Sequence, residues 1–106
     1  QVAAARIRLH RELGRFLACL ERGTANLNGL LHEQMTRDTA SARRLQLCQE
    51  RLGGWPDWPP ELVAELALFN QQLRPAERKG RLLGKEIDAA LDDPRWAAAP
   101  QRPTAS

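Results

Sequence analysis

The side chains best suited to catalysis or metal binding are two histidines and two cysteines, scattered along the chain. They are His10, Cys19, His32 and Cys48. No pair among them has the spacing of a zinc site, such as C-x2-C or H-x3-H. The sequence also has no glycine-rich phosphate loop and no serine in a nucleophile-elbow context. We therefore predict that the protein is not an enzyme and has no catalytic residue, metal site or cofactor.

Each cysteine stands alone within helix-like sequence, which favours small buried thiols in a reducing compartment over a disulfide. No apolar run has membrane-spanning length, and no secretory leader is recognisable. We therefore expect an intracellular protein, in the nucleus, the cytoplasm or both, with no membrane partner. The chain opens on Gln1 rather than on Met, so we expect a fragment or a processed product.

Basic residues at helical spacing form two stripes that could contact phosphates. The first stripe is Arg8, Arg11 and Arg15, and the second contains Arg74, Arg78, Arg81 and Lys85. Acidic residues are interleaved with both stripes, and no aromatic stacking residues accompany them. Salt-bridged, solvated helix faces are therefore the favoured interpretation. A nucleic-acid-associated helical module that uses the stripes remains the alternative function, although nucleic acid is not the expected partner.

The most regular apolar pattern in the sequence begins at Leu62 and ends at Ala90. Its members are Leu62, Leu66, Phe69, Leu73, Ala76, Gly80, Leu83, Ile87 and Ala90. Alternating steps of four and three residues are typical of a helix that packs lengthwise against another helix. The register continues through Pro75, which predicts one helix over residues 61–91 with a kink at this proline. The alternative is a new helix with Pro75 in its first turn.

Residues 2–52 contain no proline and carry a weaker heptad pattern, which predicts one long helix. Breaks near Gly23–Thr24 or Thr36–Thr39 are the alternative. The double glycine and the Trp/Pro sequence of residues 53–60 then predict a turn. The predicted fold class is all-α, a long antiparallel, coiled-coil-like helical hairpin over residues 1–94. A flexible tail is expected over residues 95–106.

The two predicted helices differ in length, which leaves part of the first one uncovered. At a rise of about 1.5 Å per residue, the first would be roughly 75 Å long and the second roughly 45 Å. An apolar strip near the start of the chain would then need a partner to cover it. The residues predicted to contact this partner are Leu13, Phe16, Leu17 and Leu20. Trp55 and Trp58 either cover the open end of the hairpin or add to the partner contacts.

From the Trp55-Pro56 turn onward, the sequence resembles the cyclin-dependent kinase 2-interacting protein family. The shared features are a long heptad helix, the Trp-Pro element, and a basic stretch that ends in a Lys-Glu-hydrophobic triplet, here Lys85-Glu86-Ile87. The resemblance covers about residues 11–91. It implies a non-enzymatic nuclear or cytoplasmic subunit in genome maintenance or ribosome maturation. Such a subunit would pair with another helical subunit and dock on a larger ATPase assembly.

Together these features predict an interaction subunit, or adaptor, of a larger intracellular complex. It would bury a leucine seam against a partner helical chain, with arginines setting register and partner choice. The partner is either a different helical protein or a second copy of this chain. A self-associating structural bundle with no further role is the remaining alternative.

Overall fold

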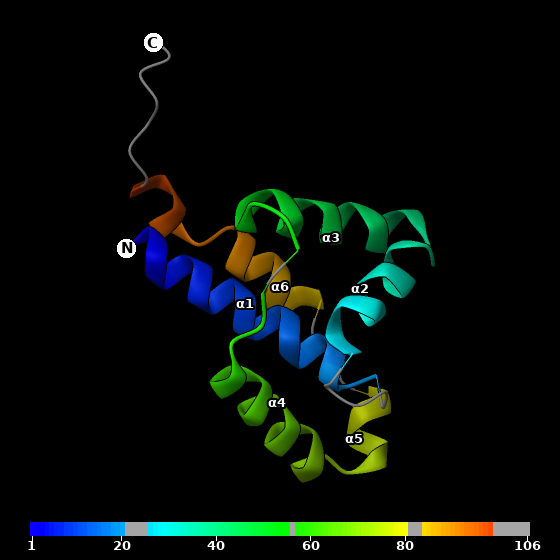
Figure 1. The fold of residues 1–106 in the computed structure, drawn as a ribbon. Coiled ribbons are helices and arrows are strands. Elements are labelled where there is room, and N and C mark those ends of the chain that lie inside the picture. The colour runs from blue at the N-terminus through cyan, green and yellow to red at the C-terminus, as the bar shows by residue number, and fades with distance from the viewer. Residues whose placement is uncertain (21–25, 56, 81–83, 99–106) are drawn as a thin grey trace.

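The helices of this protein are arranged around α1 (Val2–Ala18), as the computed structural model shows (Figure 1). The structure describes residues 1–20, 26–55, 57–80 and 84–98. Ala5, Leu9, Leu13 and Leu17 follow one another at intervals of four along α1, and each is fully buried. Side chains at this spacing form one stripe along a helix. This stripe is the centre of the hydrophobic core.

The described residues form six α-helices and one 3-10 helix, with no β-strand among them. In chain order they are α1 (Val2–Ala18), α2 (Leu27–Met35), α3 (Thr39–Leu52), α4 (Pro60–Gln72), α5 (Pro75–Gly80), α6 (Gly84–Leu91) and η2 (Pro94–Ala98). The predicted all-α class is therefore confirmed.

Helices pack against α1 from two sides (Figure 1). α4 lies along one side of α1, whereas α6, η2 and the α2–α3 pair lie on the other. Leu66 of α4 and Ile87 of α6 are both almost completely buried. The regular apolar pattern of the sequence is therefore divided among α4, α5 and α6, of which α4 and α6 reach the central helix from different directions.

The single long helix predicted over residues 2–52 is wrong, because three helices occupy this segment. α1 ends at Ala18 and α2 begins at Leu27, with residues 21–25 outside the described part of the chain. The second break follows Thr36, where Asp38 caps α3 by accepting a hydrogen bond from the Ser41 N–H at 2.8 Å. The longest dimension of the molecule is 50 Å, shorter than the roughly 75 Å of the predicted helix.

The kinked helix predicted over residues 61–91 is replaced by three helices, α4, α5 and α6, and the alternative of a new helix with Pro75 in its first turn is confirmed. α4 ends at Gln72, Leu73 has an extended backbone with ψ 132°, and Pro75 begins α5. The residue before a proline disfavours helical geometry, so a break here relieves the strain that a continuous helix would carry. Glu77 stabilises the new start, because its carboxylate accepts a hydrogen bond from the Arg74 N–H at 3.0 Å. Leu83, a member of the predicted seam, lies outside the described residues.

The turn after α3 agrees with the prediction from its two glycines. Gly53 is left-handed at φ 76°, and the Gly54 N–H donates to the Gln49 carbonyl at 2.8 Å. This pair of features is a Schellman ending, in which glycine is favoured because it has no Cβ to clash. Pro60 then takes the first position of α4, where its missing N–H costs nothing.

Order extends further toward the C-terminus than the predicted tail at residues 95–106 allows. Trp96 of η2 is buried, and its indole N–H donates to the Ala90 carbonyl at 2.8 Å. The Arg51 guanidinium lies over the Trp96 ring, 5.3 Å from the ring centroid. η2 therefore closes the end of the core beside the start of α1, as Figure 1 shows. Residues 99–106 lie outside the described part of the chain.

Both cysteines are free and buried, as their isolated positions in the sequence predicted. Burial raises the pKa of the Cys48 thiol to about 12, which keeps it protonated and unreactive at neutral pH. Among the described residues, no cluster of His, Cys, Asp and Glu side chains could hold a metal ion. None of the described helices has the length and apolar content of a membrane span.

Candidate interaction surface

The leucine strip predicted to bind a partner is covered within the chain itself. Leu13 and Leu17 have no exposed surface, whereas Phe16 and Leu20 are half-buried against the same core. The strip faces α4 and α6 because the chain folds back on α1 from both sides. The observation that would require a partner here, an exposed apolar strip, is therefore absent from the described structure. An interaction surface has to be sought elsewhere.

The two tryptophans of the turn attach this connector to α1 and α2. Trp58 packs on the His10 ring at a centroid distance of 5.3 Å, and its indole N–H donates to Asn28 Oδ1 at 3.0 Å. Trp55 contacts the edge of the His32 ring at 5.5 Å. Both tryptophans are half-buried against the core. These contacts favour a covering role, and partner binding by Trp55 and Trp58 stays a prediction.

The arginines of the first basic stripe connect α1 to its neighbours. Each of the three contacts a different residue: Arg8 Nη1 lies 2.9 Å from Asp93 Oδ2, Arg11 Nε lies 3.0 Å from Glu65 Oε2, and the Arg15 guanidinium lies 5.4 Å from the centroid of Phe69. Carboxylates neutralise two of these charges, and the third stacks on an aromatic ring. This stripe is therefore used for internal contacts.

The second basic stripe is only partly described. Arg78 donates from Nη2 to the Asn70 carbonyl of α4 at 2.7 Å, so it links α5 to α4. Lys85 is exposed on α6, and Arg81 lies outside the described residues. The described members therefore do not form a continuous row of exposed cations.

Asp93 is a structural residue that the sequence analysis did not single out. Its side chain is 3% exposed and accepts hydrogen bonds from Arg95 and Arg8. The bonds from Arg95, with a further contribution from Arg8, hold the pKa of this carboxyl far below its usual range. An ion pair that the sequence analysis also did not single out joins Arg44 on α3 to Asp88 on α6, with Arg44 Nε 2.8 Å from Asp88 Oδ1. The Arg8–Asp93 and Arg44–Asp88 pairs have no local sequence signal, because their members lie 85 and 44 residues apart, whereas Arg95 lies two residues after Asp93.

α4 is apolar on two opposite faces, of which α1 covers only one. Leu62 and Leu66 form the inner face, and both are buried. The other apolar side chains recur at intervals of three and four on the opposite face of the helix. We call this the outer face of α4, formed by Pro60, Ala64, Ala67, Leu68 and the polar Gln71, whereas Val63 lies at its edge and packs against the core. No other described helix makes an extended contact with α4.

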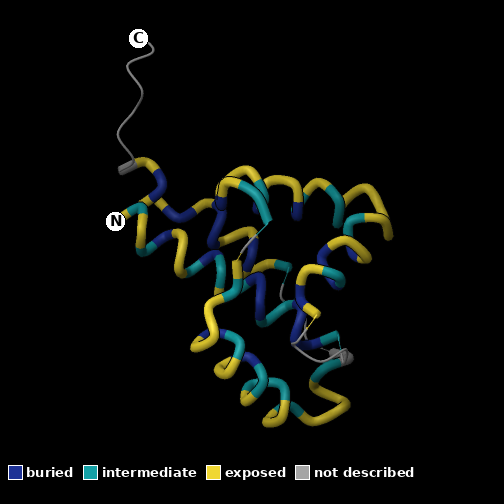
Figure 2. Tube along the Cα trace, viewed as in Figure 1, coloured by how far each residue is buried: buried dark blue, intermediate teal, exposed yellow. Residues whose placement is uncertain are grey.

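Exposure follows this division between the two faces. Leu68 is 55% exposed, Ala64 is also exposed, and Val63 and Ala67 are intermediate. Figure 2 shows the outward turns of α4 as exposed and the turns that meet α1 as more buried. Exposed Glu61 and Glu65 border the outer face beside Leu68, so a partner would have to pair these charges or leave them in water. The outer face is the best candidate interaction surface in the described structure.

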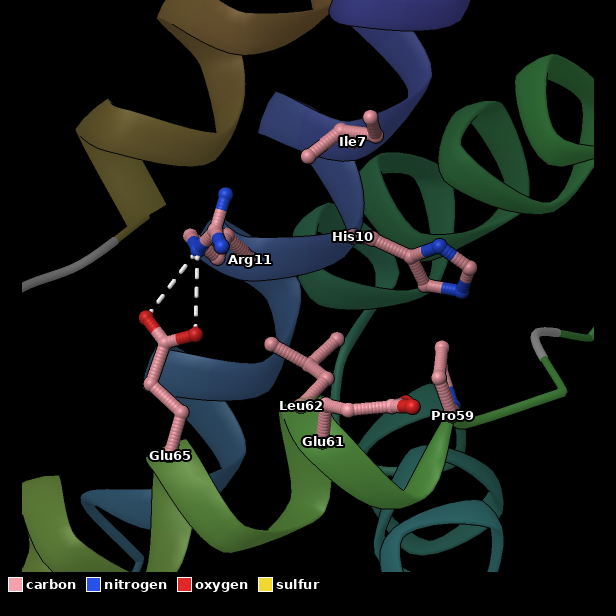
Figure 3. Close-up of a pocket in the computed structure, with 7 residues that line it drawn as sticks. All are labelled: Ile7, His10, Arg11, Pro59, Glu61, Leu62 and Glu65. Atoms are coloured by element: carbon pink, nitrogen blue, oxygen red, sulfur yellow. Dashed lines mark hydrogen bonds and ion pairs between the residues drawn. The ribbon is translucent and has the colours of Figure 1, made fainter.

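A pocket of about 230 Å³ lies beside this face, between the N-terminal halves of α1 and α4 (Figure 3). Its lining residues are Ile7, His10, Arg11, Pro59, Glu61, Leu62 and Glu65. Ile7 is 54% exposed, which is unusual for a large aliphatic side chain next to a folded core. The pocket therefore combines an apolar floor with two carboxylates and an imidazole.

His10 is held in a position that disfavours its charged form. Its Nε2 atom is buried and has no hydrogen-bond partner among the described residues. Burial, followed by the nearby positive charge of Arg6, lowers the pKa of this imidazole below 6.5. His10 is therefore neutral at pH 7 and contributes no positive charge to the pocket.

The lowered pKa of His10 predicts a specific loss of stability in mild acid. The unfolded chain binds a proton at His10 more readily than the folded chain does, so the stabilisation is complete above pH 6.5 and declines as pH falls toward the folded pKa. We expect the urea midpoint to fall between pH 7 and pH 5. His10→Phe retains a ring against Trp58 and should flatten this dependence.

The paired carboxyl groups of Asp88 and Asp93 have lowered pKa values, so their effect on stability falls at more acidic pH than the effect of His10. Circular dichroism at a series of pH values gives the midpoints for both proteins. Parallel pH profiles for the wild type and the His10→Phe variant would show that this imidazole is not the group responsible.

Comparison with protein-family models, curated proteins and solved structures found no match to this chain. The arguments for function therefore rest on the residues and the geometry of the structure.

Proposed function

We propose that this protein is a non-enzymatic helical interaction subunit that binds a partner helix on the outer face of α4. The observation that carries the proposal is the two-sided apolar character of this helix. An apolar helix face is stabilised by leaving water, so a face that the chain itself leaves open can be covered by another protein. Within the described chain α4 has one covered face, and a partner would supply the cover for the other.

The side chains of the outer face suit contact with another helix. Ala64 and Ala67 are small, so a partner backbone can approach α4 closely there. Leu68 projects beside them and is more than half exposed, so it can insert between side chains of the partner. We therefore expect Leu68 to provide the largest single contribution to binding.

The dimensions of α4 set a further expectation for the interface. Its outer face spans three turns, about 16 Å, at 1.5 Å per residue. A stable interface buries about 800 Å² on each partner, more than one short helix face offers. We therefore expect the contact to extend from α4 onto the neighbouring groove that includes Ile7.

The partner is a helical protein, either a second copy of this chain or a different subunit, and the pair would belong to a larger intracellular complex. The family resemblance would imply that such a complex acts in genome maintenance or ribosome maturation, in the nucleus or the cytoplasm. The alternative function, nucleic-acid binding by arginine stripes, is less well supported because Arg8, Arg11 and Arg15 make internal contacts.

Replacing Leu68 with glutamate should abolish association without unfolding the chain. The new carboxylate would be buried unpaired in the interface, which costs several kcal/mol there, but it stays in water in the free protein. The affinity for a second copy is measured by sedimentation, and other subunits are identified by affinity purification with mass spectrometry. Partners recovered with the wild type should be lost with Leu68→Glu.

Leu47→Glu is the matched control, because Leu47 is 42% exposed and lies on α3, away from α4. Both variants should unfold within about 0.5 kcal/mol of the wild type, as surface substitutions usually do. Association that survives Leu68→Glu, or that both substitutions weaken equally, would count against the outer face of α4.

A further inference from the structure

We propose that the pocket between α1 and α4 binds an arginine side chain from the partner, with the methylene stem on the apolar floor and the guanidinium group at Glu61. The inference rests on the proposed function for the origin of this side chain. The pocket itself involves different residues from the outer face of α4 and can be tested without a partner.

The apolar part of the pocket suits a long, flexible stem. Ile7, Leu62 and Pro59 supply aliphatic surface, and Ile7 leaves more than half of its side chain in water. A volume of about 230 Å³ is smaller than the roughly 300–1,000 Å³ of pockets that hold drug-sized ligands. It is therefore suited to one side chain. Long cationic side chains place their methylenes on such surfaces and keep the charge at the water boundary.

The charges around the pocket select a cation. Arg11 Nε lies 3.3 and 3.0 Å from the two carboxylate oxygens of Glu65, so these two charges neutralise each other (Figure 3). Glu61 has no ion pair or hydrogen bond from its carboxylate within the described part of the chain. His10 is neutral at pH 7. Among the described residues, the pocket therefore carries one uncompensated negative charge, on a chain whose net charge is +3.

Arginine fits this combination better than lysine does. Its planar guanidinium presents two parallel N–H groups that match the two oxygens of a carboxylate, whereas an ammonium group acts as a point charge. The guanidinium is also more weakly hydrated than an ammonium group, so it loses less hydration free energy on entering a half-enclosed site.

The test uses n-butylguanidinium, a mimic of the arginine side chain, titrated into the 15N-labelled protein at constant ionic strength and followed by NMR. We expect saturable shifts at the amides of Ile7, Glu61 and Leu62. The expected dissociation constant is about 1–10 mM, which is reasonable for a ligand of this size. Neutral n-butanol should bind about fivefold more weakly, because it lacks the charged contact with a partly exposed carboxylate.

Variants and comparison ligands make the outcome decisive. Glu61→Gln should weaken n-butylguanidinium about fivefold, whereas Glu86→Gln, at an exposed position on α6, should leave binding unchanged. The absence of saturable shifts, equal binding of n-butanol, or no effect of Glu61→Gln would overturn the site. Equal binding of n-butylammonium would overturn its assignment to arginine. Failure of Leu68→Glu to affect association would instead count against the proposed function and leave this titration unaffected.

Discussion

Replacing Leu13 with alanine should lower the free energy of unfolding by about 3–5 kcal/mol. Leu13 is completely buried in the middle of the α1 stripe, where it faces helices on both sides. The substitution removes apolar contacts and leaves a cavity that the surrounding helices can close only in part. A domain of this size is normally stable by about 5–15 kcal/mol, so a large share of its stability would be lost.

Ile7→Ala is the control for this experiment, because Ile7 lies on the exposed side of the same helix. It should change the unfolding free energy by no more than about 0.5 kcal/mol. Urea denaturation followed by circular dichroism gives both values. If Leu13→Ala were as mild as Ile7→Ala, Leu13 would not be enclosed by the chain, and the strip on α1 would again be a candidate partner surface.

A second large effect is expected at Gly14, where the Leu66 side chain of α4 packs directly on the backbone of α1. A Cβ atom placed on Gly14 would lie 2.4 Å from Leu66 Cδ1, far inside van der Waals contact. Leu66 is almost completely buried and cannot move aside into water. We expect Gly14→Val to destabilise the protein by roughly 2–3 kcal/mol through overpacking, more than its gain in helix propensity.

The mechanism is tested by combining Gly14→Val with Leu66→Ala. The alanine leaves room for the valine methyl groups, so the double variant should lose less stability than the sum of the two single losses. A coupling of about 1 kcal/mol or more is expected for side chains in direct contact. Additive losses would mean that Gly14 is needed for another reason and that its contact with Leu66 is not the limiting one.

The sequence predicted part of the core but not which helices present it, since Ala76 of the predicted seam is exposed and Phe69 and Leu73 are only half-buried. Leu62, Leu66, Ile87 and Ala90 belong to the predicted seam, and all four are buried. The steps of four and three residues are read from the sequence, so they stay regular even though Leu73 and Arg74 interrupt the helix. The same break changes the direction of the chain completely. Periodicity therefore identifies the apolar faces without showing that they lie on one helix.

The helix breaks were the main source of error, and one of them did have a local signal. A break near Thr36–Thr39 was the alternative to one long helix, and Asp38, within that stretch, is the N-cap of α3. An aspartate followed three residues later by a backbone N–H that it can bind is a recognised helix start. Once the first helix is divided there, the hairpin and its uncovered leucine strip no longer follow.

The candidate site could not be predicted from spacing alone. The outer face of α4 has a helical period, but so does the inner face, and only the packing shows which one is covered. The pocket joins Ile7 and His10 of α1 to Glu61 of α4, which are about fifty residues apart in the sequence. The internal use of Arg8 likewise depends on Asp93, at a sequence separation of 85. Long-range pairings of this kind have no local sequence signal.

The central position of α1 also has a consequence for how the chain reaches its native state during synthesis. α1 leaves the ribosome before any of the helices that cover it, and η2, which packs beside its start, is the last described element to emerge. The leucines of α1 therefore stay without their native neighbours while the rest of the chain is translated. Contacts between such distant segments form slowly, because the chain loses the entropy of closing a long loop before the contacts can stabilise it. The nascent chain thus passes through a period in which the apolar stripe of α1 is open to chaperones or to aggregation.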